Sequence, residues 1–165
     1  MNELQNQLFS QIQKQIESDK ASTLQFKALE FACGTCSIAE GMRETCDFLA
    51  LTDKNPAVLE NARSFADEHG ISLIPDAELD EDCYFGRFHL VYTLFGFRNL
   101  PRLVDEIMRL RRLIIKGGQM IIIDETTGNF SEQCQKQLKR CGFENFQTET
   151  FPIDGKEAFL IAVRK

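Results

Sequence analysis

The chain has 165 residues, of which 43% are hydrophobic and 27% charged, a balance typical of one globular domain. No apolar run approaches the roughly 20 residues that cross a bilayer, and the first residues lack the apolar segment of a secretory signal. We therefore expect a cytoplasmic protein without a membrane span. The net charge of −6 disfavours nucleic acid as a partner, because an acidic domain repels phosphate backbones.

Two features of the composition could suggest more specific partners. Arg109, Arg111 and Arg112 could form a local basic patch, but a solvated helix face with one buried stem is the favoured interpretation. The six cysteines are scattered rather than arranged as the framework of a small secreted domain, so we expect reduced thiols. The composition implies no particular oligomeric state.

Helical periodicity and strand-like apolar runs alternate through the first half of the chain. Pro56 suits the first turn of a helix, and Gly70 suits the end of the same helix. In chain order we expect a helix over 4–18, a strand over 26–32, a helix over 37–46, a strand over 47–53, a helix from 56 to about 69 and a short strand over 71–74.

The second half continues this alternation and then departs from it. Gly117 and Gly118 are expected to end a helix, and Asp154-Gly155 to form a turn between two strands. In order we expect a polar loop over 75–87, a strand over 88–94, a helix over 100–115, a strand over 119–124, a helix over 131–142 and strands over 143–151 and 157–164.

This order of elements predicts an α/β fold. Short apolar strands that alternate with helices indicate a parallel sheet covered on both faces, and the last two strands indicate a hairpin at its edge. We therefore predict one domain over 1–165, with a doubly wound, mostly parallel seven-stranded sheet and a C-terminal antiparallel hairpin.

Acidic residues lie at or just after the ends of the first three predicted strands, where open α/β sheets bind ligands. Asp53 could accept hydrogen bonds from both hydroxyls of a ribose, and Asp76 could accept one from the exocyclic amine of adenine. Glu30 lies near the glycine-containing turn at Gly34, where a carboxylate favours a positive sulfonium over a pyrophosphate. The strand ends thus suit an adenosine with a cationic tail.

Six segments together resemble the motifs of class I S-adenosylmethionine-dependent methyltransferases over residues 26–165. They are ALEFACGTCSIA, LALTDKNPAVLENAR, LIPDA, GRFHLVYTLFGFRNL, RRLIIKGGQMIIIDE and EAFLIAVRK. The stretch FGFRNL and its spacing to KGG are similar to methyltransferases of quinone biosynthesis. The resemblance implies the Rossmann-like methyltransferase fold.

The sequence departs from the family pattern at several positions. Ala32 and Cys36 stand where the first motif usually has glycine, and His89 stands where an aspartate is frequent. Lys54 follows the ribose acid, where an apolar residue usually lies on adenine, although the lysine stem could cover the ring. The proline expected before KGG is missing.

The resemblance implies a role for each matching residue. Glu30 would orient the turn near the sulfonium, Ala32 and Gly34 would let the backbone approach the cofactor, and Asp53 would hold the ribose. The remaining implied cofactor contacts are Lys54, Asp76, Ala77 and Thr93, and the implied acceptor contacts are Phe9, Phe95 and Phe97. We also expect a helix over 1–20 to cover the site.

The Cys33-Gly34-Thr35-Cys36 turn has a second interpretation, because a CxxC pair at a strand-to-helix turn is typical of thiol redox proteins. The predicted sheet has too many strands for a thioredoxin-like domain. A zinc site would need two further ligands, and no second close pair exists in the sequence, so we expect no metal.

The function implied by the resemblance is methyl transfer from S-adenosylmethionine by in-line displacement. This reaction depends mainly on proximity and orientation, and we assign no catalytic acid or base. The short chain favours a small or partner-presented acceptor. Two alternatives are a methyltransferase-like interaction protein with weak or lost cofactor binding, and a nicotinamide-dependent oxidoreductase, which the missing G-x-G-x-x-G run disfavours.

Overall fold

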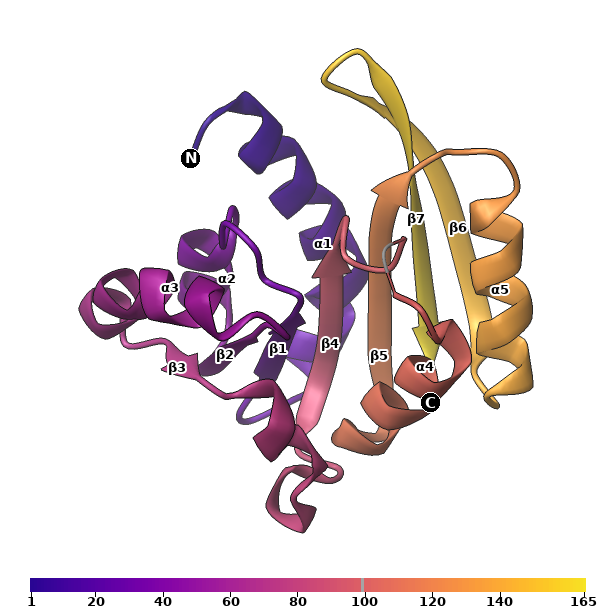
Figure 1. Cartoon of the computed structure of the whole chain (residues 1–165). Coiled ribbons are helices and arrows are strands. Elements are labelled where there is room, and N and C mark those ends of the chain that lie inside the picture. The colour runs from indigo at the N-terminus through magenta and orange to yellow at the C-terminus, as the bar shows by residue number, and fades with distance from the viewer. Residues whose placement is uncertain (99) are drawn as a thin grey trace.

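The computed structural model of the chain, which describes residues 1–98 and 100–165, contains a seven-stranded sheet with strand order β3-β2-β1-β4-β5-β7-β6 (Figure 1). Strands β1 to β5 run parallel, and β7 is antiparallel to both β5 and β6. The predicted fold class is therefore confirmed. The strands are β1 (Lys27–Phe31), β2 (Phe48–Thr52), β3 (Ser72–Leu73), β4 (Phe88–Leu94), β5 (Ile114–Glu125), β6 (Glu144–Ile153) and β7 (Lys156–Arg164).

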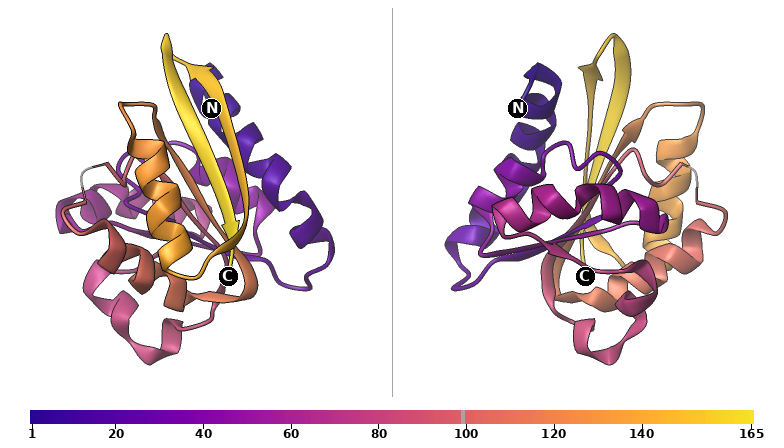
Figure 2. Two further views of the ribbon diagram at one scale, coloured as in Figure 1. Left: turned by 90° about the vertical axis from the view of Figure 1, so that its right-hand side faces the viewer. Right: turned by 60° about the vertical axis from the view of Figure 1, so that its left-hand side comes forward.

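Helices cover both faces of the sheet, which forms the middle of three layers (Figures 1 and 2). One face carries α1 (Glu3–Ala21), α2 (Ala39–Thr45) and α3 (Pro56–His69), and the other carries α4 (Leu103–Leu113) and α5 (Phe130–Arg140). The alternation of side chains in each strand divides the core in two. In β1, Ala28 packs on the α1–α3 side, whereas Leu29 and Phe31 pack on the α4–α5 side.

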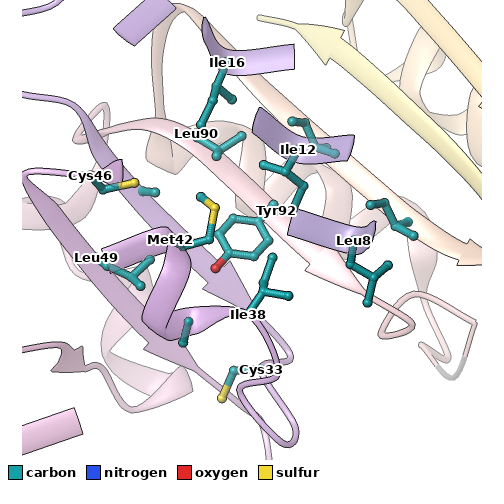
Figure 3. Packing of buried hydrophobic residues seen from close by; sticks show 14 of the residues in the cluster. Leu8, Ile12, Ile16, Cys33, Ile38, Met42, Cys46, Leu49, Leu90 and Tyr92 are labelled. Atoms are coloured by element: carbon teal, nitrogen blue, oxygen red, sulfur yellow. The ribbon is translucent and has the colours of Figure 1, made fainter. Parts of the chain in front are cut away.

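The α1 helix packs by the apolar stripe that its sequence predicts. Leu8, Ile12 and Ile16 are buried against Leu90 and Tyr92 of β4 (Figure 3). Polar contacts fix the two ends of this helix. The Gln7 amide donates to the Pro152 carbonyl oxygen at 2.6 Å, and Arg164 pairs with Asp19 at 2.9 Å. The amino end of α1 thus lies on the same side of the molecule as the carboxyl end of β4 and the β6–β7 turn (Figure 1).

Local signals determine several boundaries as expected. The Asn55 side chain accepts a hydrogen bond from the Ala57 N–H at 3.1 Å, and Pro56 occupies the first turn of α3. Gly70 ends this helix with φ +62°, in the left-handed region that glycine adopts most easily. Asp154 and Gly155 form the predicted turn between β6 and β7.

The expectation that Gly117 and Gly118 end a helix is wrong. Helix α4 ends at Leu113, and β5 begins at Ile114, so both glycines lie inside a strand. Gly117 has φ +80°, and the pairing of β4 with β5 shifts register nearby. A Cβ atom on Gly118 would lie 2.8 Å from the His89 carbonyl oxygen, so this position requires the close backbone approach that glycine allows.

Residues 75–87 are also more ordered than a polar loop. They contain two short 3₁₀ helices, η1 (Asp76–Asp80) and η2 (Asp82–Tyr84), and Leu79 of η1 is buried in the core on the α4–α5 side.

None of the helices within 1–98 and 100–165 is both long and apolar enough to cross a membrane.

Candidate functional site

The carboxyl ends of β1 and β2 meet at one edge of the sheet. The two strands pair in parallel with Phe31 opposite Thr52, so the turn after β1 lies beside Asp53. The Gly34 N–H donates to Asp53 Oδ2 at 3.1 Å, and the Asn55 N–H donates to Asp53 Oδ1 at 2.9 Å. Each carboxylate oxygen can accept more than one hydrogen bond. Asp53 is half-buried and therefore keeps capacity for hydroxyl donors of a ligand.

The turn after β1 has an unusual backbone. Ala32, Gly34 and Cys36 have φ values of +56°, +51° and +53°, all in the left-handed region. Glycine adopts this region freely, whereas a residue with a Cβ atom loses roughly 1–2 kcal/mol there. Backbone hydrogen bonds hold the turn in place, from the Cys33 N–H to the Thr52 carbonyl at 3.0 Å and from the Cys36 N–H to the Cys33 carbonyl at 2.7 Å. The chain thus keeps a glycine-type turn with side chains at two of its three left-handed positions.

A pocket of about 420 Å³, here called the α3–η1 pocket, opens beside Asp53. It contains four of the predicted cofactor residues. Its lining consists of Asp53, Lys54, Pro56, Leu59, Glu60, Arg63, Pro75, Asp76 and Ala77. A second pocket of about 640 Å³ lies between the turn and α3, with Gly34, Thr35 and Cys36 on one side and Val58, Asn61, Ala62 and Phe65 on the other.

Charged side chains connect two residues of the α3–η1 pocket to α4. Lys54 pairs with Glu106, and Arg109 contacts Glu106 and Asp76, each at 2.9 Å, and Asp80 at 3.0 Å. These five residues are here called the Arg109 network. Burial alone would lower the pKa of Arg109, but hydrogen bonds to Asp76, Glu106 and Asp80 together raise it. The guanidinium therefore remains charged, as does an ordinary arginine.

Glu30 lies inside the protein rather than in either pocket. It is 1% exposed, and the Tyr92 hydroxyl from the neighbouring strand donates to its Oε2 at 2.8 Å. Burial raises its pKa to about 8, although the hydrogen bond from Tyr92 opposes this change. In this arrangement Glu30 can support the turn from the interior of the protein. A position of Glu30 close to the sulfonium of a bound cofactor stays a prediction.

Thr93 lies close to the same turn. Its hydroxyl is buried without a hydrogen-bond partner among the described residues. A Cβ atom placed on Gly96 would lie 2.5 Å from Thr93 Oγ1 and 2.7 Å from the Ala32 Cβ, so these three residues are in close contact. An unpartnered buried hydroxyl at this edge suits a polar ligand group.

Cys33 and Cys36 are free thiols that interact with each other. Hydrogen bonding to Cys36 raises the pKa of the Cys33 thiol, and the same contact lowers the pKa of Cys36. Within the described parts of the chain, no group of three or more histidine, cysteine, aspartate or glutamate side chains is placed to hold a metal ion.

The three phenylalanines predicted to line an acceptor site have different surroundings. Phe97 is 1% exposed and packs edge-on against Phe31 on the α4–α5 side, with ring centroids 6.3 Å apart, so it presents no surface to an acceptor here. Phe9 and Phe95 are half-buried against the core on the α1–α3 side. Phe9 also lies near Gly41 of α2. Their contact with an acceptor, and the covering role of residues 1–20, stay predictions.

Sequence reasoning missed the α4 members of the Arg109 network. Glu106 is buried although it is charged, and Arg109 is only 13% exposed. One signal was available, because Glu106 lies three residues after Leu103 and four before Leu110, on the apolar stripe of the helix. A second unpredicted group joins Arg98 to Asp124 at 2.9 Å and to Glu125 at 3.2 Å, at the end of β5. In FGFRNL, Asn99 lies outside the described residues.

Solved structures share this fold over most of the chain. A SAM-dependent methyltransferase from Archaeoglobus fulgidus has a TM-score of 0.73 and 13% identity, covering 98% of this chain and 94% of that one. A SAM-dependent methyltransferase from Aquifex aeolicus has a TM-score of 0.71 and 12% identity, covering 91% and 87%. The [4+2]-cyclase SpnF has a TM-score of 0.75 and 11% identity, covering 94% and 80%. The chain thus has the class I methyltransferase fold, and the predicted resemblance is confirmed at this level.

Sequence comparison adds a weaker relation. The chain is 24% identical over 116 residues to a demethylmenaquinone methyltransferase of Staphylococcus saprophyticus, which agrees with the similarity to quinone-biosynthesis enzymes. This match covers 67% of the chain and 50% of that protein, so the chain spans about half the length of its relative. No family model matches the chain.

Proposed function

We propose that this chain is a cytoplasmic methyltransferase that binds S-adenosylmethionine at the carboxyl ends of β1, β2 and β3. The observation that carries the proposal is the position of Asp53. Its carboxylate is fixed by the Gly34 N–H at 3.1 Å and also lines the α3–η1 pocket. It therefore stands between a glycine-type turn, which suits a methionine tail, and a pocket that suits an adenine.

The residues around Asp53 have the chemistry that such a cofactor requires. Asp53 would accept hydrogen bonds from the ribose hydroxyls, Asp76 would accept one from the adenine amine, and the Ala77 N–H would donate to the ring. Ala32 and Gly34 would bring the backbone close to the methionine part. The Thr93 hydroxyl, which has no hydrogen-bond partner within 1–98 and 100–165, would offer a polar contact beside it. Lys54 would cover the base with its stem, because its ammonium is already paired with Glu106.

When bound, S-adenosylmethionine supplies a methyl group on a positively charged sulfur, and transfer leaves a neutral thioether. The contribution of the protein is to hold the methyl carbon in line with an acceptor atom, and orientation of this kind can account for about 7–11 kcal/mol of a barrier. The acceptor forms its bond to carbon as the carbon–sulfur bond breaks, and an acceptor proton leaves to water. We propose a small or partner-presented acceptor near Phe9 and Phe95.

A thermal-unfolding panel tests the cofactor. S-adenosylmethionine and S-adenosylhomocysteine should each raise the melting temperature, whereas NAD should not. A ligand present at 100 times its dissociation constant adds about 2.7 kcal/mol to the free energy of unfolding. No shift with either adenosyl ligand at millimolar concentration would contradict the proposal.

One observation favours a second function, that of a methyltransferase-like interaction protein with weak or lost cofactor binding. Ala32 and Cys36 have left-handed backbone conformations, which are strained for residues with a Cβ atom. They also place side chains in the turn. The fold itself also serves other reactions, as the [4+2]-cyclase SpnF illustrates. The thermal-unfolding panel separates the two functions. A methyltransferase should show a higher melting temperature with the adenosyl ligands, whereas an interaction protein that has lost cofactor binding should not.

A further inference from the structure

Arg109 fixes both the side chain and the backbone of Asp76. Its Nη1 atom donates to Asp76 Oδ1 at 2.9 Å, and its Nη2 atom donates to the Asp76 carbonyl oxygen. Its Nε atom donates to Asp80 at the other end of η1 at 3.0 Å. A single guanidinium from α4 therefore holds the first and last residues of η1, and its 13% exposure protects these contacts from water.

Glu106 joins the two walls of the α3–η1 pocket. Its Oε1 atom accepts from Arg109 at 2.9 Å, and its Oε2 atom accepts from Lys54. Lys54 follows the end of β2, whereas Asp76 follows the end of β3. Lys54 and Asp76 line the pocket and follow different strands. Both are thus held by the paired side chains of Glu106 and Arg109 on α4.

This arrangement leaves one oxygen of Asp76 for a ligand. Oδ1 is bound to Arg109, and no hydrogen bond to Oδ2 is found within 1–98 and 100–165. A carboxylate held in this way is an acceptor of fixed direction. It would accept from an amino group at position 6 of a purine and would repel a carbonyl oxygen at the same position.

We propose that Arg109, supported by Glu106, is a positioning residue that makes the site specific for adenine, because it aims Asp76 at the 6-amino group. This inference rests on the proposed function. It concerns the choice between two bases rather than the strength of cofactor binding in general. A pocket built to hydrogen-bond a substrate group discriminates strongly against an analogue that lacks the group.

The test compares two ligands by titration calorimetry. S-adenosylhomocysteine carries the 6-amino group, and S-inosylhomocysteine carries a carbonyl in its place. We expect the wild-type chain to prefer the adenosyl ligand by at least tenfold. Arg109→Gln should reduce this preference to less than about threefold, chiefly by weakening the adenosyl ligand. Asp76→Asn combined with Arg109→Gln should change the preference no further than Asp76→Asn alone.

Arg112→Gln is the matched control. Arg112 lies on the same helix one turn away and is 55% exposed. It pairs with Asp80 at 3.5 Å and lies over the Phe85 ring at 5.2 Å, and it does not line the α3–η1 pocket. Its replacement should leave the preference unchanged. If Arg109→Gln weakens both ligands equally, Arg109 is merely structural and the inference is wrong.

Three further outcomes are decisive. If Arg109→Gln fails to fold, Glu106→Gln replaces it, since it removes the carboxylate that supports Arg109 and so loosens the hold of the guanidinium on Asp76. The preference should then fall by about threefold, and an unchanged preference would overturn the inference. A wild-type chain that binds neither ligand would overturn the proposed function as well, whereas tight binding with an unchanged preference in folded variants overturns this inference alone.

Discussion

The two ends of the proposed cofactor site are held by different forces. At the α3–η1 pocket, ion pairs that reach across to α4 fix Lys54 and Asp76. At the turn after β1, backbone hydrogen bonds hold Ala32 and Cys36 in left-handed conformations. Charged contacts depend on which side chains are present, whereas a strained turn depends on the rest of the fold to maintain it.

This difference predicts how each end responds to substitution. Removing a charge from the Arg109 network should change which ligand binds, with modest effects on stability. Changing the turn or the residues packed beneath it should act mainly on the free energy of unfolding, because the surrounding core offsets the strain in the turn. Asp53 belongs to both ends, since it binds the Gly34 N–H and lines the pocket.

Asp53→Ala should therefore have the largest effect on binding. Each charge-assisted hydrogen bond to a ribose hydroxyl contributes about 1.5–3 kcal/mol, so the loss of two should weaken S-adenosylhomocysteine by roughly 100-fold or more. Titration calorimetry measures the affinity, and circular dichroism confirms that the variant folds.

Glu60→Ala is the control for Asp53→Ala. Glu60 lines the same pocket but is exposed and pairs with Arg63 one turn along α3. Its replacement should change the affinity by less than about twofold. Unchanged affinity in a folded Asp53→Ala variant would show that the ribose is held elsewhere.

Glu30 should make stability depend on pH in a defined direction. Burial raises its pKa to about 8 in the folded state, against 4.5 for the ordinary group. Between these values the folded state binds a proton that the unfolded state has released, so the free energy of unfolding falls as pH rises. The slope should be on the order of 1 kcal/mol per pH unit and should vanish above the folded pKa.

The measurement is urea unfolding of wild type and Glu30→Gln at pH 5.5, 6.5, 7.5 and 8.5. The difference between the two proteins removes the contribution of other groups, including His89, whose pKa burial lowers. We expect the variant to gain stability relative to wild type as pH rises. A difference that stays constant across this range would mean that Glu30 is already ionised in the fold.

Gly96→Ala should destabilise the fold beneath the turn. The added Cβ would lie 2.5 Å from Thr93 Oγ1 and 2.7 Å from the Ala32 Cβ, so the turn must move. Overpacking of this kind costs about 1–3 kcal/mol, seen as a lower urea midpoint. Because the displaced residues adjoin the site, affinity for S-adenosylhomocysteine should fall as well.

Gly118→Ala provides the comparison for Gly96→Ala. Its Cβ would lie 2.8 Å from the His89 carbonyl oxygen, in β5 and away from the strand ends that form the site. It should lower stability by a similar amount and leave affinity unchanged. If both variants weaken binding equally, the effect of Gly96→Ala reflects general loss of stability.

The same contrast between local and long-range causes explains what the sequence could predict. The bounds of α3 and β4 agree with expectation because Pro56, Asn55 and Gly70 act within one turn, and because FHLVYTL is a simple apolar run. The start of β5 could not be predicted in this way. A glycine at φ +80° ends a helix as readily as it forms a bulge, and only the approach to β4 decides between them.

The site divides along the same line. Glu30, Asp53 and Asp76 could be predicted to lie at one edge, because parallel topology places their strand ends together. Arg109 could not, since an arginine three residues after a glutamate usually forms a solvated pair. Its burial depends on how α4 packs over η1. Likewise, the motif around Phe97 did not reveal that its ring points into the core beside Phe31.

Cys36→Gly should have the smallest effect, and it tests the strained end of the site directly. Cys36 has φ +53° and is half-buried beside Gly34. Glycine at this position should relieve about 1–2 kcal/mol of strain, and the greater freedom of the unfolded chain should offset about 0.4–1 kcal/mol of it. The free energy of unfolding should rise by roughly 0.5–1 kcal/mol, and S-adenosylhomocysteine should bind up to about tenfold more tightly.

Cys36→Ala separates backbone strain from the sulfur, because alanine keeps the Cβ atom in the left-handed region and should gain no stability. Both are measured by urea unfolding and calorimetry under reducing conditions, which exclude a bond to Cys33. If the glycine variant is no more stable and binds no better than the alanine variant, Cys36 carries no strain that weakens cofactor binding, and the turn is not the weaker end of the site.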